Sequence, residues 1–210
     1  MPAASLCLDF FGAHMRVVSE AARWVNGMAT VFRDFVAEGP CVDDAFDLRI
    51  IETDSIPPAP VLPLTWEGTM PEGFYGQIFE TARAACLLVE DRVHVRLSHT
   101  GAGAEAMVRP GSQSEFFVSA SIRLVEAALA RNDQYLVHGA CLVENKSGRA
   151  TLICAPSGAG KTTTAMALAH DGFALATDDA TVVAPAGEGP LGWGFPRALK
   201  VHRKTAELLP

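Results

Sequence analysis

The stretch Ala155-Pro156-Ser157-Gly158-Ala159-Gly160-Lys161-Thr162 (APSGAGKT) decides how the C-terminal half of the chain is interpreted. It follows the apolar run ATLIC at 150–154 and opens the helical run TTTAMALAHDG at 162–172. A strand, a turn of small residues ending in Gly-Lys-Thr and then a helix is the layout of a phosphate-binding loop. Small residues let backbone N–H groups converge on phosphate oxygens, and the helix N-terminus adds the positive end of its dipole.

Two side chains complete the chemistry of this loop. Lys161 supplies a mobile positive charge for the β- and γ-phosphates, and the Thr162 hydroxyl is a hard oxygen ligand for Mg²⁺. One position departs from the usual pattern, because Ala155 stands where the first glycine is expected. Alanine does not adopt positive φ at low cost, so the loop requires an extended backbone there. The alternative is a glycine-rich turn that binds nothing. The predicted nucleotide-binding residues are Ala155, Pro156, Ser157, Gly158, Ala159, Gly160, Lys161, Thr162 and Thr163.

Composition narrows the class of protein. The chain has 210 residues, of which 49% are hydrophobic, enough for one substantial core or for one domain with a smaller companion. The net charge of −7 argues against nucleic acid as the main partner, because phosphate backbones demand a basic surface. A single nucleotide needs only a local positive site, so the acidic balance does not argue against it.

The cysteines and the hydropathy pattern indicate the cellular compartment of the protein. The five cysteines are odd in number and include no C-x-x-C pair, which predicts a reduced cytoplasmic protein with mostly buried thiols and no structural zinc site. No apolar run reaches the length of a membrane span, and we expect neither a signal peptide nor a membrane partner. The cysteines are Cys7, Cys41, Cys86, Cys141 and Cys154.

Hydrophobic periodicity predicts α+β structure in residues 1–110. Strands are expected near 5–11 and 46–50, an amphipathic helix from Ser19 to a stop at Gly39-Pro40, and a hairpin of 85–89 with 92–97. Five of the thirteen prolines fall within 57–71, which predicts an extended loop. All histidines except His138 lack ligand spacing and are expected at the surface or at helix ends: His14, His94, His99, His170 and His202.

Residues 111–210 are predicted to form the phosphate-loop domain. Ser112 with Glu115 is a possible capping box for a helix that ends near Asn132. Strands are expected at 136–144, 150–154, 173–177 and 182–184, and the glycine-rich segment 187–194 is expected to be mobile. Together these elements predict an α/β fold with a mixed sheet around the loop. It is preceded by the α+β subdomain of residues 1–110, which we expect to present or recognise the substrate.

Asp178-Asp179 lies at the end of the strand that follows the loop helix. Carboxylates at such a strand end can hold Mg²⁺, directly or through water, beside a phosphate loop. Adjacent side chains point in different directions, so one carboxylate can face the metal while the other takes a proton from an acceptor hydroxyl. The alternatives are a solvated Asp-Asp turn or a helix N-cap.

His138 precedes Gly139 in the strand before the loop strand. A histidine there could contact phosphate or tune the carboxylates, and the glycine permits close backbone approach. The alternative is a hydrogen-bonded histidine of the core.

The segments VHGACLV, RATLICAPSGAGKTTTAMAL and DGFALATDD, between Val137 and Asp179, resemble a known family. The order of strand-HG, phosphate loop and strand-DD is similar to that of the catalytic domain of HPr serine kinase/phosphorylases. It is more similar still to the smaller HPr-kinase-related proteins, which include peptide-modifying kinases of lasso-peptide clusters. The resemblance covers residues 112–204 and implies the fold shared with phosphoenolpyruvate carboxykinase.

The resemblance also implies a reaction, in which ATP and Mg²⁺ are bound and the γ-phosphate passes to a serine hydroxyl of a protein or peptide. In that pattern Lys161 and Thr162 hold nucleotide and metal, Asp178 is a metal ligand, Asp179 is the general base and His138 is the active-site histidine. It further suggests a homo-oligomer. Two alternative functions remain: a nucleotide-binding sensor or scaffold without turnover, and a small-molecule kinase. The basic candidates for closing over the phosphates are Arg197, Lys200, Arg203 and Lys204.

Overall fold

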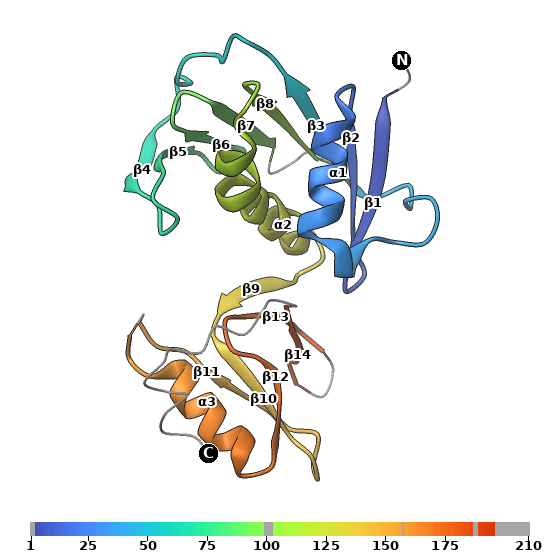
Figure 1. Cartoon of the computed structure of the whole chain (residues 1–210), viewed down its shortest axis with the longest axis vertical. Coiled ribbons are helices and arrows are strands. Elements are labelled where there is room, and N and C mark those ends of the chain that lie inside the picture. The colour runs from blue at the N-terminus through green and yellow to red at the C-terminus, as the bar shows by residue number, and fades with distance from the viewer. Residues whose placement is uncertain (1–2, 99–102, 157, 187–188, 196–210) are drawn as a thin grey trace. The chain divides into compact units, whose positions relative to one another are not determined.

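The computed structural model describes residues 3–98, 103–156, 158–186 and 189–195. The chain divides into two compact units, Met1–Arg131 and Asn132–Pro210, and both are seen in Figure 1. The boundary lies after the helical segment of residues 115–130, which therefore groups with the first unit instead of with the phosphate loop. No helix among the described residues is long and apolar enough to cross a lipid bilayer.

The first unit is built on one eight-stranded sheet with the strand order β1-β2-β3-β8-β7-β6-β5-β4. The pairs β2–β3 and β3–β8 are parallel, and the other pairs of this sheet are antiparallel. The expected mixed sheet therefore exists, but it lies in the first unit and not around the phosphate loop. Its elements are β1 (Ala4–Phe10), β2 (Ala13–Ser19), α1 (Ala22–Val31), the 3₁₀ turn η1 (Arg33–Phe35), β3 (Phe46–Glu52), β4 (Leu64–Thr69), β5 (Tyr75–Glu80), β6 (Ala84–Val89), β7 (Val93–Ser98), β8 (Gly103–Val108), the π-helical segment η2 (Glu115–Ala120) and α2 (Ser121–Ala130).

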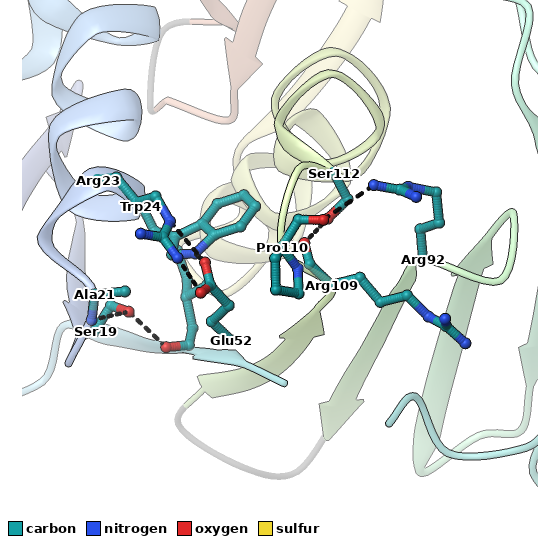
Figure 2. Close-up of polar contacts among 10 residues, drawn as sticks. Ser19, Ala21, Arg23, Trp24, Glu52, Arg92, Arg109, Pro110 and Ser112 are labelled. Atoms are coloured by element: carbon teal, nitrogen blue, oxygen red, sulfur yellow. Dashed lines mark hydrogen bonds and ion pairs between the residues drawn. The ribbon is translucent and has the colours of Figure 1, made fainter. Parts of the chain in front are cut away.

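Aromatic side chains join the helices of this unit. The buried rings of Trp24 and Phe116 meet edge to face with centroids 5.6 Å apart. Gly27 lies within α1 for a packing reason, because a Cβ at this position would collide with the ring of Phe117. The indole Nε1 of Trp24 donates to the Glu52 carboxylate at 2.8 Å, and Figure 2 shows this contact beside the Arg23 guanidinium. The helix is thus fixed to the end of β3 by both apolar and polar contacts.

Three local predictions in this unit are corrected. Ser19 ends strand β2 and α1 begins only at Ala22, because the chain pairs residues 13–19 with β1 and β3 first. The proline-containing stretch 57–71 includes strand β4, whose residues 64–69 contain no proline. Ser112 does not form a capping box: its hydroxyl donates to the Arg109 carbonyl at 2.7 Å, while Glu115 pairs with Arg92 at 2.7 Å (Figure 2 shows the arginines and Ser112).

Two further predictions are wrong because they depend on tertiary contacts. Cys7 and Cys41 form a disulfide, so the expectation of reduced cysteines is wrong for this pair; Cys86 and Cys141 are free and buried, and Cys154 is free and exposed. His94 is only 1% exposed, so its assignment to the surface is also wrong. Both errors arise because segments far away in the sequence lie next to these side chains in the fold.

The second unit contains two separate three-stranded antiparallel sheets, ordered β11-β10-β12 and β14-β13-β9. Helix α3 packs on the first sheet around the buried side chains of Ala140, Leu142 and Ala165. Residues 191–194 form a strand, which corrects the expected mobile segment 187–194 there; 187–188 lie outside the described residues. The elements are β9 (Tyr135–His138), β10 (Ala140–Glu144), β11 (Ala150–Ile153), α3 (Lys161–His170), β12 (Phe173–Thr177), β13 (Ala180–Ala184) and β14 (Leu191–Gly194).

The predicted strand 136–144 is interrupted at Gly139. The residues before the glycine form β9 and pair with β13. The residues after it form β10 and pair with β11 and β12. Gly139 is therefore the point at which the chain passes from one sheet to the other, and it places the end of β9 next to the start of β13.

Candidate functional site

The loop between β11 and α3 has the backbone conformation that its glycines permit. Gly158 and Gly160 have φ of 80° and 94°, values that side-chain-bearing residues adopt only at a cost. Gly160 is the N-cap of α3, which begins at Lys161. The N-terminal amides of a helix have no carbonyl partner within it, so a phosphate placed at this end would meet backbone donors and the positive dipole end.

Ala155 is accommodated at the first position of the loop. The described non-glycine residues with positive φ are Phe11, Glu90 and Asp133, so Ala155 does not adopt the conformation that would require glycine. The loop therefore does not need positive φ at Ala155. Ser157, which was predicted to contribute to the loop, lies outside the described residues.

Lys161 bends back over the loop. Its Nζ donates to the carbonyl oxygen of Ala155 at 2.7 Å and lies 3.5 Å from that of Pro156. These two neutral acceptors hold the ammonium near the loop backbone without neutralising its charge. The positive charge thus stays available to an anion at the helix N-terminus.

Asp178 follows β12 and is buried, with 8% of its surface exposed. Burial raises the pKa of its carboxyl and the neighbouring Asp179 charge adds to this, whereas hydrogen bonds from its own backbone amide and from the Thr162 side chain lower it. The Thr162 side chain, in the first turn of the loop helix, therefore lies close enough to Asp178 to affect its carboxyl. The alternative of a solvated Asp-Asp turn is excluded for Asp178 by its burial.

His138 lies beside Asp179, and its Nδ1 is 3.2 Å from the Asp179 Oδ1. The His138 side chain is 62% exposed, so it is not a histidine of the core. Asp179 is half-buried and lies between the buried Asp178 and this exposed ring. The imidazole and the carboxylate form a polar pair that is open to solvent.

Backbone contacts at Gly139 fix this pair. The Gly139 amide donates to the Asp179 carbonyl at 3.0 Å, and the buried Thr181 hydroxyl donates to the Gly139 carbonyl at 3.0 Å. A Cβ at position 139 would lie 2.9 Å from the Cys154 Sγ, so the close approach requires glycine. Thr181 was not predicted as a site residue, because its only signal in the sequence is a polar residue within the strand after Asp179.

The structure therefore brings most of the predicted site residues together. Thr162 reaches Asp178, Asp178 adjoins Asp179, and Asp179 meets His138, while Lys161 lies over the loop. Thr163 occupies the first turn of α3. The four basic candidates Arg197, Lys200, Arg203 and Lys204 lie outside the described residues.

The residues fit a magnesium ion better than a metal held by protein ligands alone. Among the described residues, no three His, Cys, Asp or Glu side chains gather as a metal cage. Mg²⁺ is usually held by one or two protein oxygens together with phosphate oxygens and water. Thr162 and Asp178 offer two such oxygens, and Asp178 is a buried carboxyl whose ionised form burial and Asp179 disfavour, so a cation there would stabilise that form.

Neither a scan against protein-family models nor a search of the curated proteins found a match to this chain. The resemblance to HPr-kinase-related proteins therefore depends on the sequence motifs alone, and any function is inferred from the site itself.

Proposed function

We propose that this protein is an ATP- and Mg²⁺-dependent kinase that transfers the γ-phosphate to a serine hydroxyl of a protein or peptide. The observation that carries the proposal is the placement of Asp178 and Asp179, the latter 3.2 Å from His138, beside Thr162 at the start of the loop helix. It connects a phosphate-binding element with a metal-binding and proton-accepting element, and phosphoryl transfer needs both.

The loop would bind the nucleotide through its backbone and through Lys161. The amides at the start of α3 donate to phosphate oxygens, and the Lys161 ammonium exchanges its contacts with the Ala155 and Pro156 carbonyls for the β- and γ-phosphates. Such catalysis depends on position and charge neutralisation more than on covalent chemistry.

Thr162 and Asp178 are the residues that would hold Mg²⁺. Bound there, the ion neutralises charge on the β- and γ-phosphates. Asp178 would supply an anionic oxygen and Thr162 a neutral one, which leaves the remaining coordination positions to phosphate and water oxygens.

Asp179 is assigned as the general base. It would accept the proton of the serine hydroxyl as the oxygen attacks the γ-phosphorus, with ADP as the leaving group. His138, 3.2 Å from Asp179 Oδ1 and exposed, would hold the carboxylate in place on a side that a polypeptide acceptor can reach.

The decisive experiment follows ³²P from γ-labelled ATP into a cell extract. We expect wild-type protein to label a polypeptide on serine. Lys161→Ala should abolish labelling and ATP-dependent thermal stabilisation, whereas Lys146→Ala, in the exposed β10–β11 turn, should leave both unchanged. If ATP stabilises both variants as much as it stabilises the wild type, the assignment of the nucleotide site is rejected.

A second pair of variants separates a kinase from a sensor. Asp179→Asn should remove phosphoryl transfer while largely keeping ATP affinity, and the matched exposed variant Asp171→Asn should keep both. Tight ATP binding by the wild type with no transfer to any extract component would favour the nucleotide sensor. Label recovered only in small molecules would favour the small-molecule kinase.

Cytoplasmic localisation and homo-oligomerisation are parts of the same proposal. Millimolar ATP favours the cytoplasm, but thiols there are usually kept reduced, and Cys7 and Cys41 form a disulfide. Trapping free thiols with an alkylating reagent in intact cells tests the compartment. Sedimentation of the purified protein tests the assembly.

A further inference from the structure

The two edges of the eight-stranded sheet in the first unit differ in whether another segment of the chain covers them. The β1 edge is covered by the chain itself: Leu8 forms an antiparallel bridge with Val36, and the Ala37 amide donates to the Cys7 carbonyl at 3.0 Å. The Cys7–Cys41 disulfide ties this covering segment to the edge. Covering is one of the devices by which natural sheets prevent unwanted strand pairing.

The β4 edge carries no such cover among the described residues. β4 is the last strand in the sheet order, and β5 is its partner. Residues 64–69 (LTWEGT) contain neither lysine nor proline, the residues that commonly block an edge. A register shift lies between Leu64 and Trp66, so the regular part of the edge is Trp66–Thr69.

Large side chains at this edge are exposed on both faces of the sheet. Trp66 is 39% exposed, and its ring lies over Gly68, where a Cβ would be 3.4 Å from Cζ2. On the opposite face Tyr75 is 43% exposed and donates from its hydroxyl to Glu67 at 2.9 Å, and Gln77 donates to the same carboxylate at 3.3 Å. The edge therefore has an aromatic side and an anionic side.

The charge around this edge is mainly negative. The segment 56–83 contains three acidic residues, Glu67, Glu72 and Glu80, and one basic residue, Arg83, all exposed. An extended segment beside β4 would place alternate side chains on the two faces. Apolar side chains would meet Trp66 and basic ones would meet Glu67.

We propose that the β4 edge binds an extended polypeptide of alternating basic and apolar residues by strand addition. Main-chain hydrogen bonds to β4 provide the affinity, and the two faces select the side chains. The inference concerns the first unit alone and goes beyond the proposed kinase activity, because nothing in it depends on nucleotide.

The test uses the full chain, without nucleotide, and a fluorescein-labelled decapeptide of alternating lysine and valine. Fluorescence anisotropy should show saturable binding. The same peptide with glutamate for lysine should bind at least about tenfold more weakly, since like charges now meet Glu67. The lysine–valine peptide with an N-methylated backbone keeps its charge and apolar content but cannot donate main-chain hydrogen bonds to β4, and it should not bind.

Surface variants locate the site. Trp66→Ala and Glu67→Lys should each weaken binding about tenfold, the first through loss of the apolar contact and the second through charge reversal. Glu38→Lys makes the same charge change at an exposed position beside the covered β1 edge and should change binding less than about twofold. Circular dichroism confirms that each variant is folded.

Four outcomes would overturn the proposal: no binding of the lysine–valine peptide, equal binding of the glutamate peptide, retained binding of the N-methylated peptide, or unchanged binding by both edge variants. A dimer in sedimentation that Trp66→Ala dissociates would also overturn it, since the occupant would then be a second copy of the chain. Because ATP is absent, failure here is separate from failure of the kinase proposal.

Discussion

Replacing Gly139 with alanine tests the junction between the two sheets of the second unit. The added Cβ would lie 2.9 Å from the Cys154 Sγ, 3.0 Å from the Ile153 carbonyl oxygen and 3.2 Å from Leu152 Cδ1. The Ile153 carbonyl cannot turn away without disturbing the pairing of β11 with Ala140. Overpacking of this kind costs about 1–3 kcal/mol. Alanine also restricts the unfolded chain, which offsets about 0.4–1 kcal/mol, so we expect a net loss of about 1–2 kcal/mol.

Hydrogen exchange followed by mass spectrometry is the appropriate assay, because it reports the free energy of opening for each segment and so treats the two units separately. The matched control is Gly192→Ala in β14. A Cβ there would meet Cγ2 of Thr181 at 3.7 Å and the Val182 carbonyl oxygen at 3.9 Å, which are ordinary contacts. This control should be neutral or slightly stabilising.

A double variant identifies the source of the strain. Cys154→Ala removes one of the three close contacts of Gly139→Ala and should recover about 0.5–1 kcal/mol in that background. If Gly139→Ala and Gly192→Ala open within about 0.5 kcal/mol of each other, the packing argument fails.

Three further predictions concern single side chains. Glu52→Ala removes the acceptor of the buried Trp24 indole and should destabilise the first unit by about 1–3 kcal/mol in denaturant unfolding. Burial lowers the pKa of His94, so its neutral form stabilises the fold above the unfolded pKa of about 6.5, and this stability is lost as pH falls below that value. Between pH 7 and 5 the wild type should therefore lose stability more steeply than His94→Leu, by at most about 1.4 kcal/mol per pH unit. Thr162→Val removes a hydrogen bond that lowers the pKa of Asp178, so that pKa should rise in a carbon-13 NMR titration.

Matched variants control these measurements. Asp47→Ala breaks the exposed ion pair with Arg16 and should cost less than about 1 kcal/mol. Thr164→Val changes an exposed hydroxyl of α3 and should leave the Asp178 titration unchanged. Equal losses in the Glu52 and Asp47 variants, parallel pH curves for wild type and His94→Leu, or an unmoved Asp178 titration in Thr162→Val would each contradict the corresponding argument.

The sequence could predict which segments contribute to the candidate site. The strand-loop-helix pattern around Lys161 is local, and Asp178 and His138 each stand at the end of a short apolar strand. The first strands after and before the loop lie near it in such folds, so the proximity of Thr162 to Asp178 follows from chain order. The meeting of His138 with Asp179 needed one more feature, the change of sheet at Gly139.

Features that depend on distant pairing were not predictable. The parallel pairs β2–β3 and β3–β8 join segments separated by helices and other strands, so periodicity gave no sign of the mixed sheet in the first unit. The same holds for Cys7 and Cys41, whose separation of 34 residues is not diagnostic. His94 alternates with two buried valines as a half-exposed strand would, yet it is buried as well, because the sheet there is covered on both sides.

The Cys7–Cys41 disulfide has a consequence for handling the purified protein. A reducing agent in the buffer would release the segment around Val36 to Cys41 from its covalent attachment. Non-covalent contacts alone would then hold it, among them the Leu8–Val36 bridge, the Ala37 amide bond and the Phe10–Phe35 ring contact. Each molecule would then expose the β1 edge more often, in addition to the β4 edge, and two exposed edges can propagate a linear aggregate where one edge permits only pairs. We therefore expect turbidity on storage to grow with reductant concentration, and oxidised preparations to remain clear.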